Sequence, residues 1–131
     1  IRERKRKKDE PSPMMRITQM LDKGDAFVAT DVDAVARPDS FNLVKPMYPD
    51  SLFNAHASGR VLAEFVVNAN GEPNMDTFSA VTTTHRLFVE PVRRAVREQR
   101  FMPAVRKGRP VPQVLQLPFD FVPDSTARRR N

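Results

Sequence analysis

The segment from residue 46 to residue 121 constrains the fold of this chain most strongly, because turn and helix signals divide it into short elements. Asn70-Gly71, at the end of the turn sequence Asn68-Ala69-Asn70-Gly71, is a strong hairpin signal. Before this turn, Val61–Val67 has the apolar pattern of a strand buried mainly on one face. The sequence therefore predicts an antiparallel strand pair, with the return strand at about Asn74–Val81.

A helix is predicted on each side of this strand pair. The first begins near Pro49, with Asp50 in its first turn, and Gly59 ends it. The second covers roughly Phe88–Arg100, where apolar residues recur at helical spacing. Pro91 must lie in the first turn of this helix, because proline breaks a helix interior.

A last strand is predicted over about Val111–Val122. Gln113 is the exception on its apolar face, which otherwise comprises Val111, Leu115, Leu117, Phe119 and Phe121. The order of elements is therefore helix, strand, strand, helix, strand. Two helices can cover one face of a small antiparallel sheet. We expect an α+β fold, a small two-layer sandwich with a three-stranded antiparallel sheet and two helices on one face, preceded by an extended N-terminal arm.

The chain divides into three parts on this interpretation. Residues 1–45 form a basic arm, a short helix and an irregular connector, residues 46–122 form the domain, and residues 123–131 form a basic tail. The arm helix is predicted from Ser12 to Leu21, and its apolar face comprises Met14, Ile17, Met20 and Leu21. A helix this short is unstable alone. This face must therefore dock on its own domain, on a partner or on a membrane surface, or the helix stays unfolded.

Basic residues at both ends give the chain a formal net charge of +6. The N-terminal group, which we expect to contact an anionic surface, comprises Arg4, Lys5, Arg6, Lys7 and Lys8. Such groups attract lipid headgroups or nucleic acid, and a solvated tail is the alternative. Nucleic acid is the less favoured partner, because most phenylalanines have the spacing of core residues rather than of stacking platforms.

Residues that could carry catalysis are few. The chain has no cysteine and only two histidines, His56 and His85, on different elements. Asp31, Asp33 and Asp39 lack the loop glycine and terminal glutamate of a calcium loop. We therefore expect no enzyme activity, no cofactor and no metal site.

Short motifs follow one another in a fixed order along the domain. They are Tyr48-Pro49, Gly59, Gly71, Thr83-Thr84-His85, Arg100-Phe101-x-Pro103-Ala104, Gly108-x-Pro110-Val111 and Pro118-Phe119-x-Phe121. In this order and spacing, the domain resembles the C-terminal domain of TonB-type energy transducers. The resemblance implies this fold, a periplasmic and membrane-associated location, and non-catalytic protein binding in energy-coupled outer-membrane transport.

Two features depart from the family pattern. Gln99 stands where the family commonly has tryptophan, and these 131 residues contain neither a transmembrane helix nor a long proline-lysine linker. The second departure leaves another function open. The chain would then be an accessory structural subunit that docks through its N-terminal arm on a larger membrane complex, for example a respiratory or photosynthetic one.

The last strand is the candidate binding element, because a strand at a sheet edge offers unpaired backbone groups. In the resembled family this edge pairs with a short peptide of an outer-membrane transporter. Since Pro112 and Pro118 remove backbone donors, pairing should centre on Gln113, Val114, Leu115, Gln116 and Leu117. The alternative is that these prolines protect the edge from aggregation.

Overall fold

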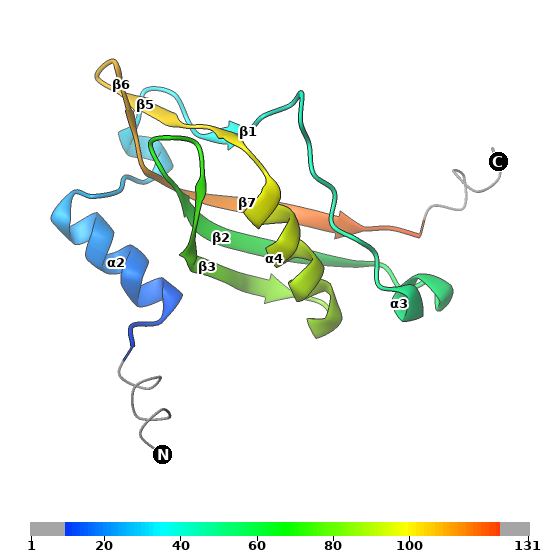
Figure 1. The fold of residues 1–131 in the computed structure, drawn as a ribbon. Coiled ribbons are helices and arrows are strands. Elements are labelled where there is room, and N and C mark those ends of the chain that lie inside the picture. The colour runs from blue at the N-terminus through cyan, green and yellow to red at the C-terminus, as the bar shows by residue number, and fades with distance from the viewer. Residues whose placement is uncertain (1–9, 124–131) are drawn as a thin grey trace.

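The computed structural model describes residues 10–123. Its centre is an antiparallel sheet of three long strands in the order β3-β2-β7 (Figure 1). These are β2 (Gly59–Val67), β3 (Pro73–Thr83) and β7 (Gln113–Phe121). The predicted α+β fold with a three-stranded antiparallel sheet is confirmed.

The two outer strands pair with β2 in different ways. The β2–β7 ladder is continuous from Gly59–Phe121 to Val67–Gln113. The β2–β3 ladder has two register shifts, and Thr77 compensates for one of them: its hydroxyl accepts a hydrogen bond from the Val66 amide at 2.8 Å. The interruptions are local bulges of β3, so β7 is the regular outer strand of the sheet.

A hairpin joins β2 to β3, as the sequence predicts, and its loop is residues 68–72, with the Gly71 amide donating to the Asn68 carbonyl at 2.9 Å. Gly71 has a φ of +86°, and a Cβ at this position would collide with the carbonyl oxygen of Phe101. The Phe101 amide in turn donates to the Gly71 carbonyl at 2.9 Å. Glycine is therefore needed both for the backbone conformation and for the close approach of the chain beyond the second helix.

The helices predicted on one face of the sheet pack against a common core. A short 3-10 turn, η2 (Arg86–Phe88), leads into α4 (Val89–Glu98), which crosses this face (Figure 1). Val92, Ala95 and Val96 of α4 are buried there. The shorter α3 (Asp50–Asn54) adds Leu52 to the same core. The core includes Phe65, Phe78, Phe88, Phe101 and Phe121, together with Val61 and Ala63.

The arm helix docks on its own domain, which is one of the possibilities that the sequence left open. It runs from Pro13 to Lys23 as α2, with the Ser12 hydroxyl capping the Met15 amide. Ile17 packs with Val66 in a second small core. Val66 belongs to the opposite face of the sheet from α4, since side chains alternate along β2. The predicted two-layer sandwich therefore has a third layer at this point.

The connector after this helix is less irregular than predicted. It contains the 3-10 turn η1 (Ala29–Asp31) and the short strand β1 (Arg37–Pro38), which pairs with β4 (Phe101–Met102).

The last predicted strand, Val111–Val122, is also divided in two. Its start belongs to a small hairpin of β5 (Ala104–Arg106) and β6 (Arg109–Val111), and β7 begins only after Pro112. Tertiary contacts rather than apolar periodicity specify these short pairs, so the sequence pattern did not reveal them.

Candidate partner-strand edge

The outer side of β7 exposes backbone groups from alternate residues. Val114 donates its amide to the Phe27 carbonyl, on the side away from β2. In an antiparallel ladder, residues alternate between bonding to the partner and facing away from it. Gln116, Pro118 and Asp120 therefore present their backbone groups outward like Val114, while the residues between them bond to β2.

The N-terminal segment closes the first part of this edge. Phe27 forms a parallel bridge beside Gln113: its amide donates to the Pro112 carbonyl at 3.0 Å, and its carbonyl accepts from Val114 at 2.9 Å. Ala26 is 2% exposed, and the Arg106 guanidinium lies 4.6 Å from the centre of the Phe27 ring. The open edge, which we define as Gln116–Asp120, begins where this bridge ends.

The five residues predicted for strand pairing take three different positions. Gln113 is buried and forms an internal hydrogen bond, with its Oε1 accepting from the Ala36 amide at 2.7 Å. Leu115 and Leu117 bond to β2 and pack against the core. The Val114 amide already donates to Phe27, and its carbonyl accepts from the Gln113 side chain at 3.0 Å. Gln116 is therefore the one member of the predicted set whose backbone groups face outward in the open edge.

Pro118 and Asp120 extend the open edge beyond the predicted range. Pro118 has no N–H, so it contributes a carbonyl alone. The side chain of Asp120 pairs with Arg60 at 2.9 Å, on the neighbouring strand. The sequence signal that could have found these residues is the alternation along β7, but its phase depends on which side of the strand bonds to β2.

The other predicted contact residues are placed as follows. In the arm helix, Ile17 is buried, Met20 and Leu21 are half-buried against the small core of Ile17, Ala26 and Val66, and Met14 is 60% exposed. The predicted anionic-surface group, Arg4, Lys5, Arg6, Lys7 and Lys8, lies outside the described residues.

A hollow beside the open edge lies on the side of the sheet that carries α4. This edge groove has a volume of about 180 Å³ and is lined by Leu43, Val44, Phe101, Leu117 and Phe119, with Pro118 at its rim. The residues that line it come from the connector, from α4 and the following β4, and from β7 itself. Leu117, Pro118 and Phe119, three residues of the open edge, belong to its lining.

Gln99 forms the polar part of the groove lining and anchors the connector. Its Oε1 accepts from the Val44 amide at 2.8 Å, and its Nε2 donates to the carbonyls of Asn42 and Arg100. The side chain is 5% exposed. Both N–H groups and the oxygen of this amide are therefore occupied within the domain.

A second hollow, of about 450 Å³, lies between residues 44–49 and α4. Apolar residues such as Met47, Leu87 and Pro91 line it, and charges of both signs stand at its rim, among them Glu90 and Arg94. Nothing in this lining pairs a nucleophile with a base. This hollow is therefore an apolar depression of the surface with a charged rim.

Two acidic residues with lowered pKa values, Asp39 and Glu72, are held by hydrogen bonds within the domain. Two hydrogen bonds hold the pKa of Asp39 below its usual range, the first from the Asn42 side chain and the second from the Phe41 amide. Across residues 10–123, no three His, Cys, Asp or Glu side chains lie together as metal ligands would.

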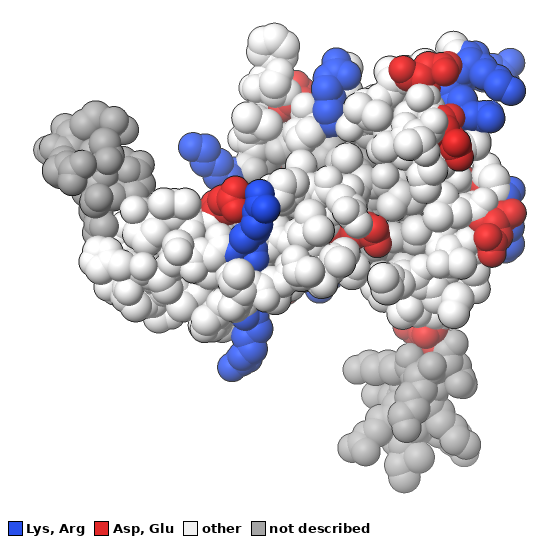
Figure 2. Space-filling view, turned by 180° about the vertical axis from the view of Figure 1, so that it is seen from behind, with Lys and Arg blue, Asp and Glu red and all other residues white. Residues whose placement is uncertain are grey.

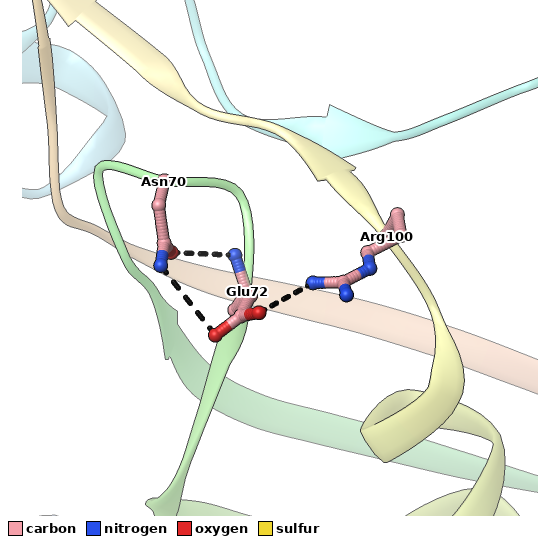
Figure 3. Close-up of polar contacts among 3 residues, drawn as sticks. All are labelled: Asn70, Glu72 and Arg100. Carbon is pink, nitrogen blue, oxygen red and sulfur yellow. Dashed lines mark hydrogen bonds and ion pairs between the residues drawn. The ribbon is translucent and has the colours of Figure 1, made fainter.

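Glu72 illustrates such a pairing at the β2–β3 turn (Figure 3). Its carboxylate accepts from the Arg100 guanidinium at 2.7 Å, and the side-chain Oδ1 of Asn70 accepts from the Glu72 amide at 3.0 Å. The hydrogen bond from Arg100, followed by the charge of Arg100, lowers the pKa of Glu72. These contacts fix the turn to the end of α4.

The charges of the described residues do not form one basic surface on the face seen in Figure 2, where Lys and Arg are scattered around a largely uncharged centre. On the other side, α4 carries several arginines. One of them, Arg93, pairs with Glu90 at 3.3 Å, and its guanidinium lies over the Phe78 ring, 4.7 Å from the ring centre. Within the described part, the arrangement is poorly suited to tracking a phosphate backbone.

Comparisons with known proteins agree with the motifs of the domain. The family model for the Gram-negative bacterial TonB protein C-terminal matches residues 44–123. A solution NMR structure of the Pseudomonas aeruginosa TonB C-terminal domain is 25% identical, with a TM-score of 0.54, covering 72% of this chain and 90% of that chain. No curated protein sequence matches significantly. No helix among residues 10–123 has the length and apolar character needed to cross a membrane.

Proposed function

Because this chain belongs to the Gram-negative bacterial TonB C-terminal family, whose domains are periplasmic and non-catalytic, we propose that it binds a short extended segment of an outer-membrane transporter. The segment adds to the sheet as a strand along the open edge Gln116–Asp120. Binding of this kind couples the chain to energy-dependent transport and holds it at the outer membrane. The backbone supplies the affinity, and neighbouring side chains supply the specificity.

The observation that carries this proposal is the outward orientation of alternate backbone groups on β7. Gln116 and Asp120 each offer an N–H and a carbonyl, and Pro118 offers a carbonyl. The strand is regular over its whole length against β2, which suits it to template a further strand. The Phe27 bridge sets the limit of the site on the side of Pro112.

Titration calorimetry with a peptide of the transporter box sequence tests the proposal. We expect Gln116→Pro to abolish binding, because it removes the central outward N–H of the open edge. Proline is tolerated on an edge strand where its missing N–H would face solvent, and the circular dichroism spectrum of the variant verifies its fold.

Gln116→Ala is the matched control. It removes the same side chain but keeps the N–H, so we expect its affinity to remain close to that of the wild type. Equal affinities for Gln116→Pro and the wild type would show that the peptide binds elsewhere. Absence of binding by the wild type at millimolar peptide would refute the proposed function itself.

The alternative function, docking of the arm helix on a larger membrane complex, has no support from the described residues. The apolar face that motivated it packs mainly inside the molecule, where Ile17 is 6% exposed. Met14 and Met15 are the exposed apolar residues of this helix, and they are adjacent rather than spaced as a helical stripe.

A further inference from the structure

We infer that the edge groove is a specificity pocket, which accepts one aliphatic side chain of the strand that pairs with β7. The inference rests on the proposed function, since it requires a strand on the open edge. It adds to that function the chemical class of residue that the partner strand must carry at one position.

The geometry of the sheet directs a partner side chain into the groove. Along β7, Leu117 and Phe119 point to the core face and line the groove, whereas Pro118 reaches its rim from the strand between them. Side chains of adjacent strands that point to the same face lie about 4.5–5.5 Å apart at their Cβ atoms. Alternate residues of an added strand therefore stand beside Leu117 and Phe119, at the mouth of the groove.

The lining of the groove selects an apolar guest. Gln99 is its polar lining residue, and its amide oxygen and both amide N–H groups already have partners. The remaining lining side chains are aliphatic, aromatic or proline. A polar or charged guest would lose its hydrogen bonds to water without replacement, whereas an aliphatic guest gains from leaving water.

Leu43 is a groove residue that can be replaced without disturbing the core. It is 63% exposed, so it contributes little to the core, yet it borders the groove through the connector that Gln99 anchors. Neighbouring Val44 is held by the Gln99 hydrogen bond, which keeps this wall in place. Changing Leu43 should therefore alter the groove and leave the fold intact.

An array of transporter-box peptides, with Ala, Val, Leu or Asp at each position in turn, tests the inference. With the wild type, we expect one position at which Val or Leu binds about tenfold more tightly than Ala, as partial burial of one aliphatic side chain would give. Asp at that position should weaken binding. Leu43→Ser should largely remove the preference while retaining affinity for the Ala peptide.

Met14→Ser is the matched control, because Met14 is similarly exposed, at 60%, but lies on the arm helix. It should keep the wild-type preference. Binding without an aliphatic preference at any position, or an unchanged preference in Leu43→Ser, would overturn the inference and leave the proposed function standing. Failure of every peptide to bind the wild type would overturn the proposed function as well.

Discussion

Two buried glutamines fasten the connector to the domain. Gln113 accepts from the Ala36 amide at 2.7 Å, and Gln99 accepts from the Val44 amide at 2.8 Å. Buried backbone groups are rarely left without a partner, because each unmade bond costs about 1–3 kcal/mol. These two side chains therefore supply the hydrogen-bond acceptors that a neighbouring strand would supply to backbone amides in a sheet.

We expect Gln113→Leu to lower the free energy of unfolding by about 1–3 kcal/mol, because the Ala36 N–H would be buried without an acceptor. Urea denaturation measures the change. Gln19→Leu is the control, since the side chain of Gln19 in α2 is exposed. Equal losses in the two variants would contradict a structural role for the Gln113 amide.

The pKa of Glu72 should respond to its ion pair. Arg100→Gln should raise this pKa toward its usual value, as measured by NMR titration of the carboxyl carbon, because the hydrogen bond and charge that lower it are removed. A lowered pKa means that the pair contributes stability above the usual glutamate pKa and loses it as the pH falls through the lowered value. The stability of the wild type and Arg100→Gln should therefore converge in acid.

Arg86→Gln is the control for this titration, because Arg86 lies at the opposite end of the second helix. It should leave the pKa of Glu72 as it is in the wild type. If Arg100→Gln also left it there, the ion pair would not be the cause of the shift.

At the residue scale, the sequence marked Gln113 as unusual but did not reveal which residue it binds. Gln113 stands out as the one polar residue on the apolar face of the last strand. Its acceptor role requires Ala36, which is 77 residues away. No local pattern marks that contact, because it depends on how the connector folds back over the domain.

Among the elements, those with their own start and stop signals were predictable. Ser12 and Gly24 bound α2, Pro91 lies in the first turn of α4, and Asn70-Gly71 forms the β2–β3 turn. The short strands β1 and β4 carry no such signals. Two residues each are too few for a periodicity, and only their pairing makes them strands.

The docking of α2 yields a prediction at this scale. Ile17→Ala should reduce the free energy of unfolding by about 2 kcal/mol, because it removes buried apolar atoms between α2 and Val66. Met14→Ala on the same helix should change it by less than about 0.5 kcal/mol, as is usual for exposed positions. Thermal or urea unfolding compares them, and equal effects would show that α2 does not rest on the sheet.

In the molecule as a whole, the N-terminal segment frames the proposed binding edge. The α2 helix covers part of one face, Phe27 closes the start of the β7 edge, and residues 43–44 form a wall of the edge groove. The family motifs predicted the domain. They could not reveal where the N-terminal segment packs, because most of that segment lies outside residues 44–123, which match the family.

Amide hydrogen exchange, followed by NMR with and without a transporter-box peptide, tests the central claim most directly. We expect the peptide to slow exchange at Gln116 and Asp120, whose N–H groups face outward. Val114 should change little, because it already donates to Phe27. Peptide binding that protects β3 or the hollow beside α4 instead, with Gln116 and Asp120 unchanged, would contradict strand addition at β7.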